Sequence, residues 1–188
     1  MNIQQAKNYA SDLQVALECE EAISLVPEFA KILFSAWKLG NVVFICGNGG
    51  SAANASHMAN DFIYGAGIKN GGGLKVEALT ANTAILTCLA NDVGYDSVFS
   101  EQIKVKASKG DVLVVLSGSG NSSNVVKALE EAKKLQMHTV AILGFTGGKC
   151  KDLADVSIHF DVNDMQIAED LQLIVGHMCM QWLSEQKL

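Results

Sequence analysis

The sequence has little charge and almost no proline, and both shortages exclude broad classes of protein. Charged residues make up 18% of the chain, and 20 acidic against 14 basic side chains give a formal net charge of −6. Without a basic surplus the chain cannot neutralise a phosphate backbone, so we expect no nucleic-acid partner. Pro27 is the single proline and 49% of the residues are hydrophobic, which is typical of a folded protein. A length of 188 residues predicts one domain over residues 1–188 with a substantial core.

Long apolar runs are also missing. The longest, such as Val112–Leu116 and Thr139–Leu143, are about one strand long, whereas a membrane helix needs ~20 residues. The polar stretch Met1–Cys19 lacks the basic start and apolar run of a secretion signal. We therefore expect no membrane partner and a cytoplasmic location. The five cysteines form no CxxC pair, which argues against a disulfide framework or a thiolate zinc site and for reduced, mostly buried thiols.

Apolar spacing divides the chain into helices and short strands. It predicts two amphipathic helices within residues 1–40, Ala6–Leu17 and Ile23–Trp37, with Pro27 early in the second and Gly40 as its terminator. A final helix, Met165–Leu183, is expected to turn five residues to the core: Ile167, Leu171, Ile174, Met178 and Leu183. Between them the pattern predicts helices at Ala52–Phe62, Thr83–Leu89, Val98–Lys106 and Asn124–Leu135.

Five short β-branched and apolar runs alternate with those helices. They are Asn41–Cys46, Leu74–Leu79, Val112–Leu116, His138–Leu143 and Val156–Phe160. Such alternation, with nearly continuous apolar strands, predicts an α/β protein whose parallel sheet is covered on both faces. The glycine-rich segment Gly65–Gly73 is predicted to be a flexible loop over a site.

Two of the strand–loop–helix units carry unusual loops, GNGGS over residues 47–51 and SGSGNS over residues 117–122. In a parallel sheet both loops lie at the carboxyl ends of the strands, where helix-start N–H groups can receive an anion. The second loop adds hydroxyl donors, and its glycines allow close approach of the backbone. Neither loop matches GxxxxGK[ST], and the first does not match GxGxxG, so a phosphate monoester fits better than a nucleotide triphosphate or dinucleotide. The alternative, that both are only tight turns with helix caps, stays open.

Two histidines lie at helical spacing from a carboxylate. His57 and Asp61 are four residues apart, so they share a helix face and could share a metal. Glu169 and His177 are eight apart, a little over two turns, and again share a face. A lone histidine on a helix is more often a hydrogen-bonded structural residue, and we assign His138 and His159 to such roles.

Four ordered motifs resemble the sugar isomerase (SIS) domain family, and most of all its phosphoheptose isomerase (sedoheptulose-7-phosphate isomerase) branch. They are CGNGGSAANASH, LANDVGYDSVFSEQI, GDVLVVLSGSGNSSNVVKAL and AEDLQLIVGH, and the likeness covers nearly the whole chain. The resemblance implies a three-layer αβα sandwich with a five-stranded parallel flavodoxin-like sheet and two leading helices. It also implies a homotetramer, with active sites at subunit boundaries and with residues 1–40 packing on the core and in the oligomer.

Matching the motifs implies the site residues. The phosphate-binding serines of the family fall on Ser117, Ser119 and Ser122, and Gly118 stands where the family usually has threonine. Further substrate contacts fall on Asn48, Gly49, Gly50, Ser51, Asn91, Asp92 and Glu169. The family's zinc ligands, His, Glu, Gln and His, fall on His57, Asp61, Glu169 and His177. Asp61 matches the catalytic base and His177 its acid–base partner.

The activity implied is conversion of sedoheptulose 7-phosphate to a heptose 7-phosphate for lipopolysaccharide, capsule or another surface glycan. The partners implied are a small sugar phosphate and a divalent metal, zinc by its ligands. Two alternatives stay open. One is an SIS isomerase for another ketose phosphate, because nothing in the loops measures sugar length. The other is a non-catalytic SIS protein that binds a replication-initiation partner; retention of both histidines with two carboxylates argues for catalysis.

Overall fold

Five short strands form one parallel sheet in the order β2-β1-β3-β4-β5. The computed structural model describes residues 1–67 and 72–187, so residues 68–71 of the predicted flexible loop lie outside the described residues. The strands are β1 (Val42–Gly47), β2 (Lys75–Ala78), β3 (Val112–Ser117), β4 (His138–Leu143) and β5 (Val156–His159). All six residues of the central strand β3 are buried, as expected for a strand covered on both faces.

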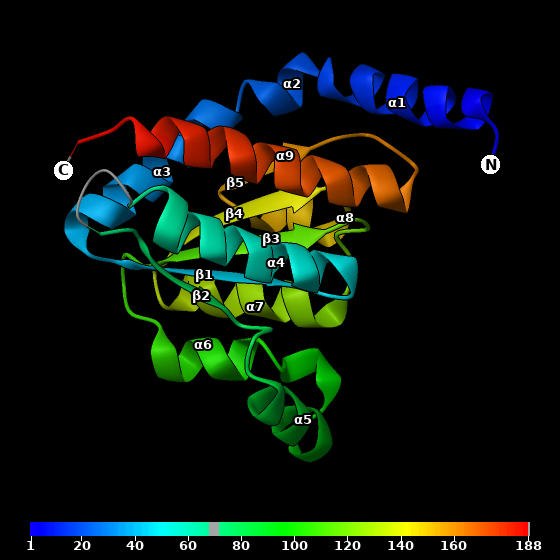
Figure 1. The fold of residues 1–188 in the computed structure, drawn as a ribbon. Helices are drawn as coiled ribbons and strands as arrows, with labels where there is room; N and C mark the ends of the chain where they lie inside the picture. The colour runs from blue at the N-terminus through cyan, green and yellow to red at the C-terminus, as the bar shows by residue number, and fades with distance from the viewer. Residues whose placement is uncertain (68–71, 188) are drawn as a thin grey trace.

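Helices cover both faces of the sheet, which confirms the predicted three-layer αβα sandwich (Figure 1). One face, with Val43, Ile45 and Val114, packs against α3 (Val26–Leu39), α4 (Gly50–Asn60) and α9 (Met165–Ser184). The other face, with Phe44, Leu113 and Val115, packs against α6 (Ser100–Lys106), α7 (Ser123–Lys134) and α8 (Gly148–Leu153). Successive strand residues point to opposite faces, so each strand supplies both layers of core.

The amino-terminal segment contains three helices where two were predicted. They are α1 (Ile3–Leu17), α2 (Glu20–Ile23) and α3, so the predicted helix Ile23–Trp37 is broken after its first residue. Pro27 is the physical cause, because a proline ring clashes with the carbonyl four residues earlier and has no N–H to donate. It is tolerated in the first turn of α3, and Gly40 ends that helix with φ +73°, as predicted.

The predicted core face of the last helix is partly wrong. Ile167, Leu171 and Leu183 are buried as expected, but Met178 is 40% exposed and Ile174 is only half-buried. Val175 and Cys179 are buried in their place, one position further along. This helix is apolar on more than one side, so the spacing of its apolar residues could not decide which side faces the sheet.

Two helices lie at the periphery. None of the residues of α1 or of α5 (Thr83–Asp92) is buried, and α5 projects away from the sheet (Figure 1). α1 runs beside α9, where the Tyr9 hydroxyl donates to Oδ2 of Asp170 at 2.5 Å. This hydrogen bond raises the pKa of Tyr9 to about 12. None of the described helices combines the length and apolar character needed to cross a bilayer.

Candidate active site

The two unusual loops leave the sheet side by side. β1 and β3 are parallel neighbours, with Gly47 paired to Leu116 at their carboxyl ends. A β-carbon on Gly47 would lie 2.8 Å from the Leu116 carbonyl oxygen, so glycine is needed for this close approach. The first loop leads directly into α4, and the second leads into α7. The sheet therefore places both loops, and the starts of both helices, at one edge, as predicted.

The serine loop over residues 117–122 is held in shape by its own hydroxyl oxygens. Ser117 is buried, and its Oγ accepts the N–H of Gly120 at 3.0 Å. Ser119 Oγ accepts the N–H of Asn121 at 3.3 Å. Both hydroxyls use their oxygens as acceptors, so their O–H protons can be donated to a ligand. Ser122 occupies the cap position of α7 without a side-chain capping bond, which leaves the helix start for a ligand.

Gly118 has a packing reason to replace the threonine of the family. A β-carbon at this position would lie 2.6 Å from Sδ of Met165. The first residue of α9 thus occupies the space that a threonine side chain would need. The loop loses one hydroxyl, and Met165 covers the position instead.

An anion bound at this edge would meet backbone N–H groups and hydroxyls but no arginine, because the chain contains none. Lys127 lies on α7 close to the serine loop, but its ammonium pairs with Asp96 and donates to Ser97 Oγ at 3.3 Å. The hydrogen bond from Lys127 holds the pKa of Asp96 below its ordinary value. Lys127 is therefore neutralised by this pair, and the loops supply the donors.

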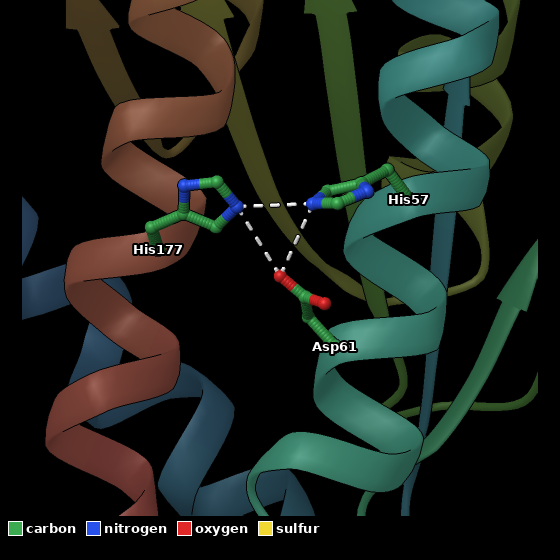
Figure 2. Close-up of side chains that lie close together, drawn as sticks. All are labelled: His57, Asp61 and His177. Atoms are coloured by element: carbon green, nitrogen blue, oxygen red, sulfur yellow. Dashed lines mark hydrogen bonds and ion pairs between the residues drawn. The ribbon is translucent and has the colours of Figure 1, made fainter.

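Three predicted ligand residues converge beside α4 and α9. His57 comes from α4, His177 from α9, and Asp61 from the π-helical turn η1 (Asp61–Gly65) that continues α4 (Figure 2). The two Nε2 atoms lie 3.0 Å apart. Oδ2 of Asp61 lies 3.4 Å from the first and 3.3 Å from the second. Figure 2 shows both rings and the carboxylate pointing toward one another.

This triangle fits a divalent metal. In a tetrahedral zinc site with bonds of ~2.0–2.1 Å, two ligand atoms lie ~3.3–3.4 Å apart, close to the three separations in this group. Two imidazoles and one carboxylate are also the ligand types that zinc accepts, and three protein ligands leave one position open, as in catalytic zinc sites. His57, Asp61 and His177 could therefore hold the ion, and their ligand atoms all lie within 4.8 Å of one another.

Glu169 lies elsewhere in the site. Its carboxylate contacts Gly50, the first residue of α4, where a β-carbon would be 2.2 Å from Oε2. Glu169 and His177 are eight residues apart, a little over two turns, so they share a face of α9. Eight residues of helix rise ~12 Å, which places Glu169 near the start of α4 and His177 near its end. The structure thus brings three of the four predicted ligands together and places the fourth, Glu169, beside Gly50 of the GNGGS loop.

Ser51 is enclosed by a polar network that the sequence did not reveal. Gln172 is 1% exposed, and its Nε2 donates to Ser51 Oγ at 3.1 Å. Its Oε1 accepts from Nδ2 of Asn54 at 3.0 Å, and Asn54 also donates to the carbonyl of Glu169 at 2.9 Å. Ser51 is itself only 3% exposed, so it supports the loop from beneath. The sequence signal is weak: a single glutamine on the buried side of α9.

Asn91 and Asp92 lie at the end of the projecting helix α5. Asn91 Nδ2 donates to Oδ1 of Asp92 at 2.7 Å, and Sγ of Cys88 donates to Oδ2 at 3.5 Å. Among the described residues, neither Asn91 nor Asp92 bonds to the two loops or to the histidines. Contact with the loops comes instead from Tyr95, whose hydroxyl donates to Oδ1 of Asn48 at 2.9 Å. Sequence reasoning did not single out Tyr95.

Comparison with known proteins gives one consistent result. The profile of the SIS domain family matches residues 8–144. The phosphoheptose isomerase of Aliarcobacter butzleri is 40% identical over 79% of this chain and 78% of its own. The probable phosphoheptose isomerase of Thermoplasma acidophilum is 36% identical over 96% and 98%. The solved phosphoheptose isomerase of Neisseria gonorrhoeae superposes with a TM-score of 0.87 at 30% identity, covering 97% of this chain and 98% of that one.

Proposed function

The chain belongs to the SIS domain family, among the phosphoheptose isomerases, and from this we propose that it converts sedoheptulose 7-phosphate into a heptose 7-phosphate. It is a sugar-phosphate isomerase by its relatives. The observation that carries the proposal is the convergence of His57, Asp61 and His177, with His57 about two turns along α4 from the GNGGS loop. Phosphate-binding loops and an acid–base group with metal ligands are the two parts that such an enzyme needs.

In the proposed mechanism the two ends of the substrate are held by different elements. Ser117, Ser119 and Ser122 donate to the phosphate, with the backbone of the serine loop around Gly118 and Gly120 approaching it closely. His57, Asp61 and His177 hold a divalent ion, zinc by ligand type, as the cofactor. When bound, such an ion supplies positive charge that stabilises negative charge developing on the substrate oxygens.

Isomerisation moves one proton between adjacent carbons and another between their oxygens. Asp61 is proposed as the base that removes the carbon-bound proton and returns it to the neighbouring carbon, and Glu169 is the alternative base. His177 is proposed to carry the second proton between the oxygens, so His177 and Asp61, whose Nε2 and Oδ2 lie 3.3 Å apart, would alternate between metal-ligand and proton-transfer roles during turnover. Glu169, beside Gly50, would face the substrate together with Asn48 and Gly49 of the loop and with Asn91 and Asp92, whereas the buried Ser51 would hold the loop from beneath.

We further propose a cytoplasmic homotetramer that supplies heptose for a surface glycan. The unburied helices α1 and α5 support an assembly, because both carry apolar side chains that a single chain leaves exposed, as Ile3 and Val15, or only half-buried, as Ile85. Residues 1–40 would then pack both on the core and between subunits.

The test is an NMR assay of the purified protein with sedoheptulose 7-phosphate, with chelator and after zinc is restored. We expect turnover that chelator removes and zinc recovers. Asp61→Ala and His177→Ala should abolish turnover and keep the native oligomer, whereas His138→Ala, at the opposite edge of the sheet, should remain active. Full activity in both site variants would overturn the mechanism. Turnover only with a ketopentose or ketohexose phosphate would reassign the substrate, and phosphate-ester binding without any turnover would favour a non-catalytic SIS protein.

A further inference from the structure

A pair of side-chain amides joins the two loops of the site. Asn124, in the first turn of α7, is 2% exposed. Its Nδ2 donates to Oδ1 of Asn48 at 2.8 Å, and Nδ2 of Asn48 donates to Oδ1 of Asn124 at 2.8 Å. The two residues are 76 positions apart in sequence, and Asn48 lies within the GNGGS loop. The pair therefore couples the first loop directly to the helix that follows the serine loop.

Backbone chemistry fixes which way each amide points. The N–H of Val125 donates to Oδ1 of Asn124 at 2.9 Å, and a backbone N–H can only donate, so this atom must be the oxygen. The other terminal atom of the Asn124 amide is then the nitrogen, and this Nδ2 donates to Oδ1 of Asn48. Tyr95 donates its hydroxyl proton to the same oxygen at 2.9 Å. Three hydrogen bonds from two other elements thus set the orientation of Asn48.

The remaining capacity of Asn48 follows by counting. An amide oxygen has two lone pairs, and Asn124 and Tyr95 occupy both. An amide nitrogen has two N–H groups, and one of them bonds to Asn124. In the described part of the chain the second N–H has no partner. Asn48 can therefore act toward a ligand only as a donor, through one N–H of fixed direction.

We propose that Asn124 and Tyr95 are positioning residues that hold Asn48 as a single-direction hydrogen-bond donor to an oxygen of the sugar phosphate. The inference rests on the proposed function only in taking the GNGGS loop as part of the sugar-phosphate site. Neither residue needs to touch the substrate. A phosphate oxygen, which accepts hydrogen bonds, matches the one free N–H.

A double-mutant cycle tests whether both residues act through Asn48. Tyr95→Phe removes one hydrogen bond and should raise KM about 2- to 10-fold, with kcat changing less. Asn124→Ala removes two bonds to Asn48 and should raise KM by about 10-fold or more. In an Asn48→Ala background neither substitution should raise KM further. Equal effects in both backgrounds, or an unchanged KM in both single variants, would overturn the proposal.

Asn41→Ala is the matched control for a purely structural role. Asn41 is a half-buried asparagine just before β1, at the end of the strand away from the site, and its Nδ2 donates to the Gly110 carbonyl at 2.6 Å. This variant should lower the melting temperature and leave KM unchanged. A rise in KM as large as that of Asn124→Ala would show that lost stability explains both, against the proposal.

Binding of inorganic phosphate, measured by calorimetry, separates this inference from the assignment of the reaction. If the wild-type protein binds phosphate but turns over no sugar phosphate, the proposed reaction fails while the inference is still tested. Weaker phosphate binding in Asn124→Ala and Tyr95→Phe, but not in their Asn48→Ala counterparts, supports it. Equal affinity in all variants, or no phosphate binding by the wild type, overturns it.

Discussion

The carboxylate of Glu169 lies in the space beside Gly50 that any larger residue would need. A β-carbon on residue 50 would be 2.2 Å from Oε2 and 2.4 Å from both Oε1 and the carboxyl carbon. Gly50 begins α4, whose positive dipole end favours a negative group at this position. Because Gly50 has no side chain, the Glu169 carboxylate of α9 can pack directly against the start of α4.

Gly50→Ala should impair catalysis more than stability. The added methyl group overlaps the far end of the flexible Glu169 side chain, which can move away at low cost to folding. Because the carboxylate then leaves the loop, we expect kcat/KM to fall by about 10-fold and the melting temperature to change little. Steady-state kinetics and thermal melts check this. Gly72→Ala is the control, since a β-carbon there meets no heavy atom within 4 Å; kinetics of Gly50→Ala equal to this control would contradict the prediction.

Metal binding should distinguish Glu169 from the three converging residues. His57→Ala removes one of two imidazole ligands and should weaken zinc binding by at least about 100-fold. Glu169→Gln should leave the metal affinity nearly unchanged, because its carboxylate lies on Gly50 outside the His57–Asp61–His177 group. Competition with a chromophoric chelator measures both affinities. Loss of zinc from Glu169→Gln would show that this side chain joins the metal when the ion is present.

Gln172→Leu should destabilise the fold. The substitution leaves the buried Ser51 Oγ without its donor and removes one of the two hydrogen bonds that Nδ2 of Asn54 donates, at a cost of about 1–3 kcal/mol in the free energy of unfolding. Urea denaturation followed by circular dichroism measures the change. The same substitution at Gln181, an exposed residue of the same helix, should stay within about 0.5 kcal/mol of the wild type. Equal stability of the two variants would mean that the network around Ser51 contributes nothing.

Alkaline pH should destabilise the protein through its buried thiols. Burial raises the pKa of Cys179 from 9.0 to about 12 and that of Cys150 to about 11. Above pH 9 the unfolded chain releases these protons while the folded chain keeps them, so the unfolded state binds fewer protons and stability falls as pH rises. The contribution is complete below pH 9. It is lost between pH 9 and about 12 for Cys179 and between pH 9 and about 11 for Cys150, at about 1.4 kcal/mol per pH unit for each thiol.

Urea midpoints at pH 8 and pH 10 measure this dependence. The decline between the two should be shallower in Cys179→Ala than in the wild type, whatever the absolute stability of the variant. Identical declines would show that the Cys179 thiol ionises as readily in the folded state as in the unfolded chain.

Local sequence pattern was sufficient for the sheet and the two loops. β3 and β4 are short runs of buried apolar residues with no competing helical period, so the predicted and observed strands nearly coincide. Pattern was insufficient where several faces are apolar, as at Met178 and Val175 on α9, because packing against α3 and α4 decides the rotation of that helix. It also missed the break before Pro27, where one steric clash outweighs the helical spacing around it.

For the site, spacing along one helix identified His57 with Asp61, a pair that the structure brings together with His177. The same rule could not locate Glu169. Two residues eight positions apart share a helix face, but they are separated by two turns along the axis and need not reach the same site. The hydrogen-bonding roles of Tyr95, Asn124 and Gln172 escaped sequence reasoning for a different reason. Each acts through one hydrogen bond or a few to a distant segment, and no local pattern encodes those partners.

The two histidines of the proposed metal site come from α4 and α9, and this has a consequence for the nascent chain. His57 and His177 are 120 residues apart, and a ribosome adding ~5–20 residues per second needs roughly 6–24 s to synthesise the segment between them. Throughout that interval α4 can present His57 and Asp61 alone, a two-ligand half-site. A metal ion can complete its set of protein ligands only after α9 has emerged and packed, so maturation of the centre must follow translation of that helix.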